Sequence, residues 1–441
     1  MGIRTAIFVL LFLICTIGAF GMPLLGLLGY MAHYVIGPER QWWAAPLQQY
    51  DIRYSFTLAA VAAVGCLLHW RSLRYGTQFL TFQEKLFLSF LAMAWLVRAI
   101  SEPTALYTVV DHPTLKLTKV FLFSLMLTHV VTDCKSLKAV FWTLTISMFL
   151  VAIQAYNTPR SAFEGGRLEG IGGVDFNESN FLCAFIVGVL PLMGVLFLDS
   201  RWLGKLVILA AGVFSVNTIV LTRSRGAVVG MVLGGVVAVV LAPKGYRKLI
   251  AAGLVVAGLG FVYLSDPAFL SRLSTITREE EERDISAQSR IELWHVSRDI
   301  VRDYPQGIGP GNFFQFAGRY DARYEGRDVH NTYLRCATEV GVVGFLLFIA
   351  LIANAFVVLI RTMRKARALP AELQKQILLP AYGLAVGLCM MLGTGLTVTL
   401  VYTEALWWFL MMPVCMERIM HNLAADAVAK AAAAIPVEEV L

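Results

Sequence analysis

The chain of 441 residues is dominated by apolar side chains. Hydrophobic residues make up 58% of it and charged residues only 15%, whereas about a quarter of a soluble domain is charged. This composition excludes an ordinary soluble domain. The formal net charge of +7 is explained by basic residues that flank membrane spans, so it predicts no nucleic-acid partner. The seven cysteines are scattered and predict neither a disulfide framework nor a zinc site.

Apolar runs that suit membrane-crossing helices recur along the whole sequence. About 20 apolar residues in a helix cross the roughly 30 Å of hydrocarbon in a bilayer. No alternating strand pattern indicates a barrel, so the chain is predicted to be an all-α polytopic membrane protein with about twelve transmembrane helices. The twelve runs lie at residues 3–36, 52–69, 86–100, 115–131, 137–155, 179–198, 203–222, 226–242, 248–264, 338–360, 376–393 and 400–416.

The positions of lysine and arginine predict the orientation of these spans. One set of alternate connections holds 18 basic residues, whereas the short connections of the other set hold 8, and positive charge is retained in the cytoplasm. Both termini are therefore predicted to be cytoplasmic. The long loop at 265–337 is predicted to lie on the opposite side of the lipid bilayer. This requires residues 3–36 to cross once, although Gly21, Met22 and Pro23 leave open a split into a span and a re-entrant piece.

The loop at 265–337 is far longer than a connection between two helices requires, so it is expected to carry function. Its residues 286–305 predict one helix, which Pro305 ends. The predicted organisation is nine spans within 1–264, this large outer loop, three spans within 338–418 and a cytoplasmic tail at 419–441.

The large loop contains ten arginines and no lysine between residues 265 and 335. The planar guanidinium group offers a fork of donors that suits phosphate oxygens. A phosphorylated lipid or an anionic polymer is therefore an expected ligand, although most of these arginines balance the twelve acidic residues of the loop. Arg290 lies on the predicted helix.

Two further outer connections carry candidate binding residues. The sequence TRSRG at 222–226 places Arg223 and Arg225 at the membrane boundary, on the side that is normally poor in positive charge. They either extend toward the interface or hold an anionic ligand. The connection at 166–180 carries Arg167, Asn177 and Asn180, which are candidates for binding a polar ligand.

The end of the large loop holds the remaining candidates. The segment GIGPGNF at 307–313 includes Asn312, and its glycines either turn the chain or bring N–H groups close to a phosphate. His330 and Asn331 follow, and an imidazole can accept a proton near neutral pH. No DxD or HExxH pattern predicts a metal, and only Glu39 and Asp51 in the first outer connection leave a metal site open.

Several of these motifs, taken in order, resemble the O-antigen ligase and polymerase superfamily of bacterial envelope glycosyltransferases. The resemblance implies a GT-C-like enzyme of the inner membrane whose active site faces the periplasm. It also implies inverting transfer of a glycan from undecaprenyl diphosphate to an acceptor hydroxyl. The matching pieces are DFNESN, SRG at 224–226, SRIELW at 289–294, GIGPGNF, HNTYL at 330–334 and the E-x-G-x-x-G of Glu339 to Gly344.

The resemblance also implies roles for single residues. Arg225 and Arg290 are expected to contact the diphosphate and His330 to be essential, as a general base or as a group that orients the acceptor. No metal or other cofactor is expected, because arginine can neutralise the leaving diphosphate. Further substrate- or diphosphate-binding residues are predicted to be Arg223, Arg167, Asn177, Asn180, Asn312 and Asn331.

The sequence leaves the reaction partner of the glycan open. A ligase would transfer a finished glycan to lipid A–core or to another hydroxyl acceptor, including protein. A polymerase would use the same donor and a second lipid-linked repeat unit. A non-enzymatic flippase for lipid-linked glycans is the third alternative, but it would require a charged path through the bundle, whereas the charges of this chain gather at one surface.

Overall fold

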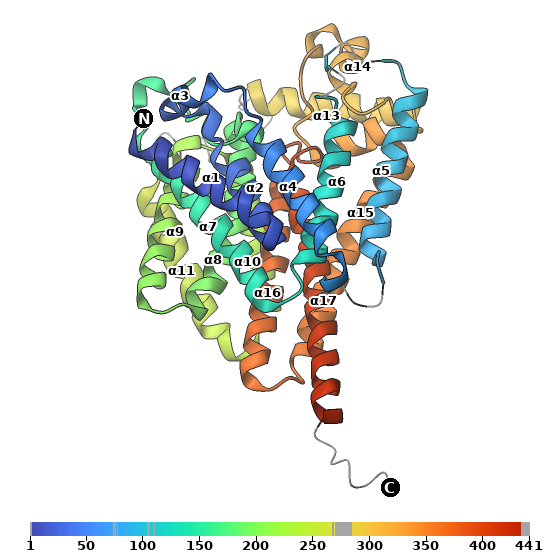
Figure 1. Cartoon of the computed structure of the whole chain (residues 1–441). Coiled ribbons are helices and arrows are strands. Elements are labelled where there is room, and N and C mark those ends of the chain that lie inside the picture. The colour runs from blue at the N-terminus through green and yellow to red at the C-terminus, as the bar shows by residue number, and fades with distance from the viewer. Residues whose placement is uncertain are drawn as a thin grey trace.

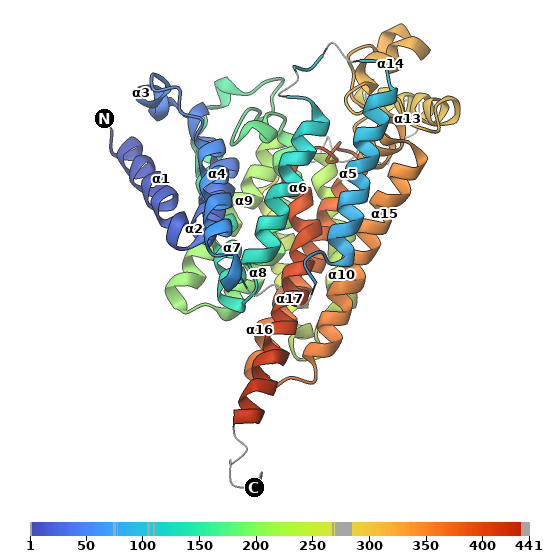
Figure 2. The same cartoon turned by 45° about the vertical axis from the view of Figure 1, so that its right-hand side comes forward.

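The computed structural model is a bundle of helices (Figures 1 and 2), as expected for an all-α protein. The description below covers residues 2–73, 76, 78–103, 106–108, 111–266, 269 and 285–433. Within these residues no strand is formed, and the one isolated β-bridge joins Glu164 and Arg167.

The first apolar run forms two helices instead of one. Helix α1 spans Ile3–Gly21 and α2 spans Pro23–Ile36. Met22 between them has an extended backbone with φ −142°, and Pro23 cannot donate a hydrogen bond to a preceding turn. The chain therefore turns back at Met22, and of the two readings of residues 3–36 the structure supports the split into two helices.

The hairpin of α1 and α2 determines the end of the bundle at which α1 begins. Gly29 lies against Cys15, and the Thr5 hydroxyl donates to the carbonyl of Trp43 at 2.7 Å. The amino-terminal end of α1 consequently lies at the same end of the bundle as the large loop, whereas α17 (Glu404–Ala433) runs to the opposite end (Figures 1 and 2). The predicted placement of both termini on one side does not hold in this structure.

The other apolar runs coincide with helices. Within the described residues, seven helices are long and apolar enough to cross a membrane, which supports a multi-pass membrane protein. The predicted tail continues α17 without a break to Ala433, and residues 434–441 lie outside the described residues. The remaining α-helices are α3 (Ala45–Gln48), α4 (Tyr54–Leu68), α5 (Phe82–Ile100), α6 (Pro113–Val130), α7 (Cys134–Asn157), α8 (Ser179–Asp199), α9 (Trp202–Thr222), α10 (Arg225–Leu241), α11 (Arg247–Leu264), α13 (Ile285–Asp303), α14 (Phe313–Tyr320), α15 (Thr332–Ala366) and α16 (Ala371–Thr394).

Helix α15 contains a break that positions the large loop. It begins at Thr332, six residues before the predicted span, because the Asn331 side chain caps its first turn. Gly341 then interrupts the helix with φ +78°, a left-handed value that suits glycine. The carbonyls of Thr338 and Glu339 before the break accept hydrogen bonds from the loop.

A layer of aromatic side chains fills the middle of the bundle. Phe87 of α5 stacks on Trp407 of α17 with ring centroids 4.1 Å apart. Phe90 and Phe348 pack against the same indole, and all four side chains are fully buried. This layer joins α5, α15 and α17 beneath the loop.

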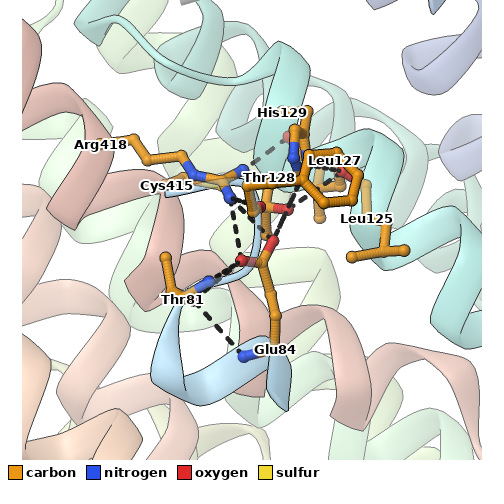
Figure 3. A network of polar contacts seen from close by, with 9 residues as sticks. Thr81, Glu84, Leu125, Leu127, Thr128, His129, Cys415 and Arg418 are labelled. Atoms are coloured by element: carbon orange, nitrogen blue, oxygen red, sulfur yellow. Dashed lines mark hydrogen bonds and ion pairs between the residues drawn. The ribbon is translucent and has the colours of Figure 1, made fainter. Parts of the chain in front are cut away.

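A buried ion pair ties α5, α6 and α17 at the end away from the large loop (Figure 3). The Arg418 guanidinium lies 2.9 Å from the Glu84 carboxylate, and the two side chains are 2% and 0% exposed. Thr128 donates to the other carboxylate oxygen at 2.6 Å. The backbone N–H of Thr81 also donates to Glu84 and completes a capping box at the start of α5.

Candidate active site on the outer loop

The described part of the large loop has a small hydrophobic core of its own. The predicted helix is confirmed as α13, and its Trp294 indole N–H donates to the carbonyl of Val329 at 3.2 Å. This core fixes α13 and the segment before α15 as one unit. Its buried members include Leu293, Ile300, Ile308, Phe313, Phe316 and Val329. Three of the ten loop arginines, Arg272, Arg278 and Arg283, lie outside the described residues.

His330 has an unusual backbone conformation between two fixed neighbours. Its φ of +48° lies in the left-handed region, which is uncommon for residues other than glycine. Val329 before it is fully buried, and Asn331 after it caps α15. These neighbours hold the turn, and the imidazole Nδ1 lies 3.5 Å from a carboxylate oxygen of Asp328.

Charges from three parts of the chain act on His330. Partial burial lowers the pKa of its imidazole below the usual 6.5, and the positive charges of Arg290, Arg335 and Arg167 lower it further, whereas Asp328 raises it. Arg290 comes from α13 and Arg167 from the connection at 166–180. The structure thus gathers three of the residues predicted from sequence, and it keeps the imidazole neutral and able to accept a proton near pH 7.

Glu178 adds a carboxylate to this group that sequence reasoning missed. Partial burial and the negative charges of Asp328 and Glu169 raise its pKa, while Arg167 and Arg290 lower it. Glu178 is one of the two acidic residues of the DFNESN motif, and its place in that motif was the available signal.

The predicted arginine of the 166–180 connection locks the TRSRG turn in place. The Arg167 Nε donates to the carbonyl of Thr222 at 2.9 Å, and its Nη2 donates to Ser179 and Asn180. Asn180 also accepts from the hydroxyl of Ser224 at 3.0 Å. Two outer connections that are distant in sequence therefore form one wall of the site.

The TRSRG arginines extend this wall. Arg223 ends α9 in a left-handed conformation, and its guanidinium lies 3.6 Å from the Asp266 carboxylate, where the large loop begins. Arg225 is the first residue of α10. The contacts around His330 described above do not include Arg225, so its predicted role on the diphosphate stays a prediction.

The remaining predicted asparagines hold loops together. Asn177 accepts from Arg40 at 2.6 Å. The Asn312 amide donates to the carbonyls of Glu102 and Ile308, and that of Asn331 donates to Leu396 at 3.0 Å. Their predicted contacts with substrate therefore remain predictions, and the described role of each is structural.

The glycine-rich segment GIGPGNF docks the loop on the break in α15. The N–H groups of Ile308 and Gly309 donate to the carbonyls of Thr338 and Glu339 at 2.9 and 3.0 Å. A side chain at Gly307 would place its Cβ 2.6 Å from the backbone nitrogen of Gly341, which explains a glycine at this close approach. Of the two uses considered for these glycines, the structure supports the turn and not the phosphate cradle.

The carboxylates of the first outer connection gather no metal-binding cluster in the described part of the chain. Glu39 lies 2.6 Å from the imidazole of His33. Partial burial raises the pKa of the Glu39 carboxyl, but the hydrogen bond and charge of His33 lower it, and the net result is a lowered pKa. No group of three or more His, Cys, Asp or Glu side chains in the described residues is arranged to hold a metal ion.

Comparison with known protein families finds a match, and it covers this region of the chain. No curated protein matches the chain. The family model described as O-antigen ligase matches residues 210–349, from α9 to the outer part of α15. The matched segment includes the TRSRG turn, Arg290 and His330, while the wall at 166–180 lies outside it. Residues 210–349 therefore carry the O-antigen ligase domain, which confirms the superfamily that the motifs indicated, one of membrane enzymes that transfer glycans.

Proposed function

We propose that this protein is a GT-C-like glycosyltransferase of the bacterial inner membrane. It moves a glycan from undecaprenyl diphosphate to an acceptor hydroxyl at the periplasmic face. The observation that carries the proposal is that Arg290 and Arg167 lie within electrostatic range of the partly buried His330, within and beside the segment that matches O-antigen ligase. Arginines suit the diphosphate and the neutral imidazole suits the acceptor proton.

The reaction needs little covalent chemistry from the protein. The acceptor oxygen attacks the anomeric carbon of the glycan while the bond from that carbon to the diphosphate oxygen breaks, with inversion. The acceptor proton passes to His330, and the released diphosphate keeps the electron pair of the broken bond. Arg290, together with Arg225 at the TRSRG turn, neutralises the developing negative charge, and the fixed loop orients the reactants.

A ligase is the leading form of this function, with lipid A–core or another hydroxyl compound as acceptor. A polymerase would share the donor site. The flippase alternative would require a polar path through the bundle, and the buried rings around Phe87 and Trp407 leave none between α5, α15 and α17.

Reconstitution of the purified protein in lipid vesicles separates these three activities. The vesicles contain an undecaprenyl-diphosphate-linked glycan and candidate acceptors, and the products are resolved by size. A single transfer to lipid A–core is the expected result. A growing ladder on the carrier would indicate a polymerase, and transbilayer movement without a new glycosidic bond would indicate a flippase and overturn the enzymatic proposal.

The same assay tests the expected independence from metal. Transfer is expected to continue at an unchanged rate after divalent cations are removed by a chelator, because guanidinium groups supply the positive charge. Loss of transfer in the chelator, with recovery when a divalent cation is added back, would contradict this expectation.

A further inference from the structure

Asp328 lies between the proposed catalytic imidazole and a buried arginine. One carboxylate oxygen is 3.5 Å from Nδ1 of His330, and the other accepts a hydrogen bond from Arg335 at 2.6 Å. We propose that Asp328 is the positioning residue that orients His330 and raises its basicity in glycan transfer. This inference rests on the proposed function and adds a residue that no motif had singled out.

The arginine behind Asp328 is held rigidly. Its side chain is only 2% exposed, and its Nε lies 2.8 Å from the carboxylate of Glu339, which is fully buried. The guanidinium also stacks over the ring of Phe314, 4.3 Å from the centroid. A buried charge must be paired and hydrogen-bonded to be stable, so Arg335 has little freedom and fixes the place of the Asp328 carboxylate.

Glu339 connects this pair to two other segments. It accepts a hydrogen bond from the backbone N–H of Phe313 at 2.9 Å and another from the Tyr402 hydroxyl at 2.6 Å. Contacts therefore run without interruption from the connection before α17, through Glu339, Arg335 and Asp328, to His330. Such a chain of ion pairs and hydrogen bonds holds a geometry more firmly than any single contact does.

The position of Asp328 determines which nitrogen of His330 reacts. A carboxylate beside Nδ1 favours the tautomer with its proton on Nδ1, which leaves Nε2 to accept the proton of the acceptor hydroxyl. The same carboxylate stabilises the imidazolium that forms as the new glycosidic bond replaces the bond to diphosphate. Release of the proton to water afterwards returns the imidazole to its starting state.

The other charges that face His330 act against Asp328, so the contribution of Asp328 can be measured as a change in the pKa of the imidazole. Arg290 from α13, Arg335 from α15 and Arg167 from the 166–180 connection all lower the pKa of the imidazole, as does burial. Asp328 opposes them, and Glu178 lies within electrostatic range of Asp328 and two of these arginines. Removing the negative charge of Asp328 consequently lowers the pKa of His330.

The test is the substitution Asp328→Asn, assayed for transfer of undecaprenyl-diphosphate-linked glycan in vesicles. The isosteric amide still accepts from Arg335, so the fold is preserved. We expect kcat to fall at least ~10-fold, which is a part of the ~10²–10⁴-fold that a general base supplies. Because the neutral imidazole is the active form, the acidic limb of kcat/KM against pH is expected to move to lower pH.

Asp321→Asn is the matched control. Asp321 lies in the same loop and pairs with the exposed Arg323 at 2.6 Å, away from the contacts of His330. Its substitution is expected to change neither the rate nor the pH profile.

Two results with Asp328→Asn would overturn the inference. One is an unchanged rate, and the other is a reduced rate with an unmoved acidic limb, which would mean that Asp328 is structural only. If the amide variant folds poorly, Asp328→Glu is the second variant, because it keeps the negative charge. It is expected to transfer glycan more slowly, with the acidic limb of kcat/KM at the same pH as in the wild type. An acidic limb shifted to lower pH in this variant would refute the proposal. Failure of the wild-type protein to transfer glycan at all would instead refute the proposed function.

Discussion

Arg290→Ala is expected to reduce glycan transfer at least ~100-fold, the loss typical of removing one preorganised donor from a developing negative charge. Arg290 lies on α13 and acts electrostatically on His330, where the diphosphate of the donor is proposed to sit. Because the helix is fixed by its own core, the variant should insert and fold normally. The measurement is transfer by purified, reconstituted protein, with thermal unfolding as the check on folding.

Arg298→Ala on the same helix provides the matched control. Arg298 is exposed and contacts His295 at 3.0 Å, so its loss should leave transfer within about twofold of wild type, as for surface substitutions remote from a site. Arg290→Lys keeps the charge but not the planar fork, so partial activity is expected. Near-normal transfer by a well-folded Arg290→Ala variant would refute the site.

His330→Ala and Arg225→Ala extend this prediction to the other two residues. Loss of His330 should remove the contribution of the general base, roughly 10²–10⁴-fold. Arg225→Ala is expected to abolish transfer as well, although its role rests on the family resemblance alone. If Arg225→Ala proves fully active while the other two variants are inactive, the arginine of the TRSRG turn lies outside the diphosphate site.

Arg418→Ala should produce a large loss of stability. The substitution leaves the fully buried Glu84 carboxylate without its counter-charge (Figure 3), and breaking a buried pair by removing one partner costs about 3–5 kcal/mol. The expected result is a marked fall in the melting temperature of the protein in detergent, with transfer lost only through unfolding.

Two variants test the cause of this loss. The double substitution Glu84→Gln with Arg418→Met removes both charges. The amide oxygen can keep accepting from the backbone N–H of Thr81, and the amide NH2 can donate to the Thr128 hydroxyl, which also bonds to the Leu125 carbonyl. Most of the stability should therefore return. Lys138→Ala breaks an exposed pair with Asp199 and should cost at most about 1 kcal/mol. A melting temperature of Arg418→Ala as high as that of Lys138→Ala would contradict the prediction.

Most of the helical architecture could be predicted from sequence, because apolar runs of membrane length leave the backbone no alternative to a helix. The first run is the exception. It is continuous in hydropathy, and only Met22 and Pro23 signal the hairpin. A proline at a helix start and a proline within a helix look alike in the sequence until the packing of α1 against α2 is known, so the sequence left a single span and a split run both open.

The site was predictable in part for a similar reason. His330 and Arg290 stand in motifs whose residue types suggest their chemistry. Asp328 and Arg335 were missed, and Glu339 was noted only as part of a motif, because an ion pair depends on how the loop folds onto α15. Arg335 looks like one more arginine of a charged loop. Glu339 offered a signal, since a carboxylate within an apolar helix usually has a partner and a purpose.

The break at Gly341 sets the boundary of an exchangeable module. Residues 332–340 are helical, yet they receive the glycine-rich turn of the loop and carry Arg335 and Glu339. They therefore belong mechanically to the loop, while the helix beyond Gly341 belongs to the bundle. A chimera that borrows the loop of a relative has to be joined at Gly341, because a junction at Thr332 would separate the imidazole from the residues that hold it.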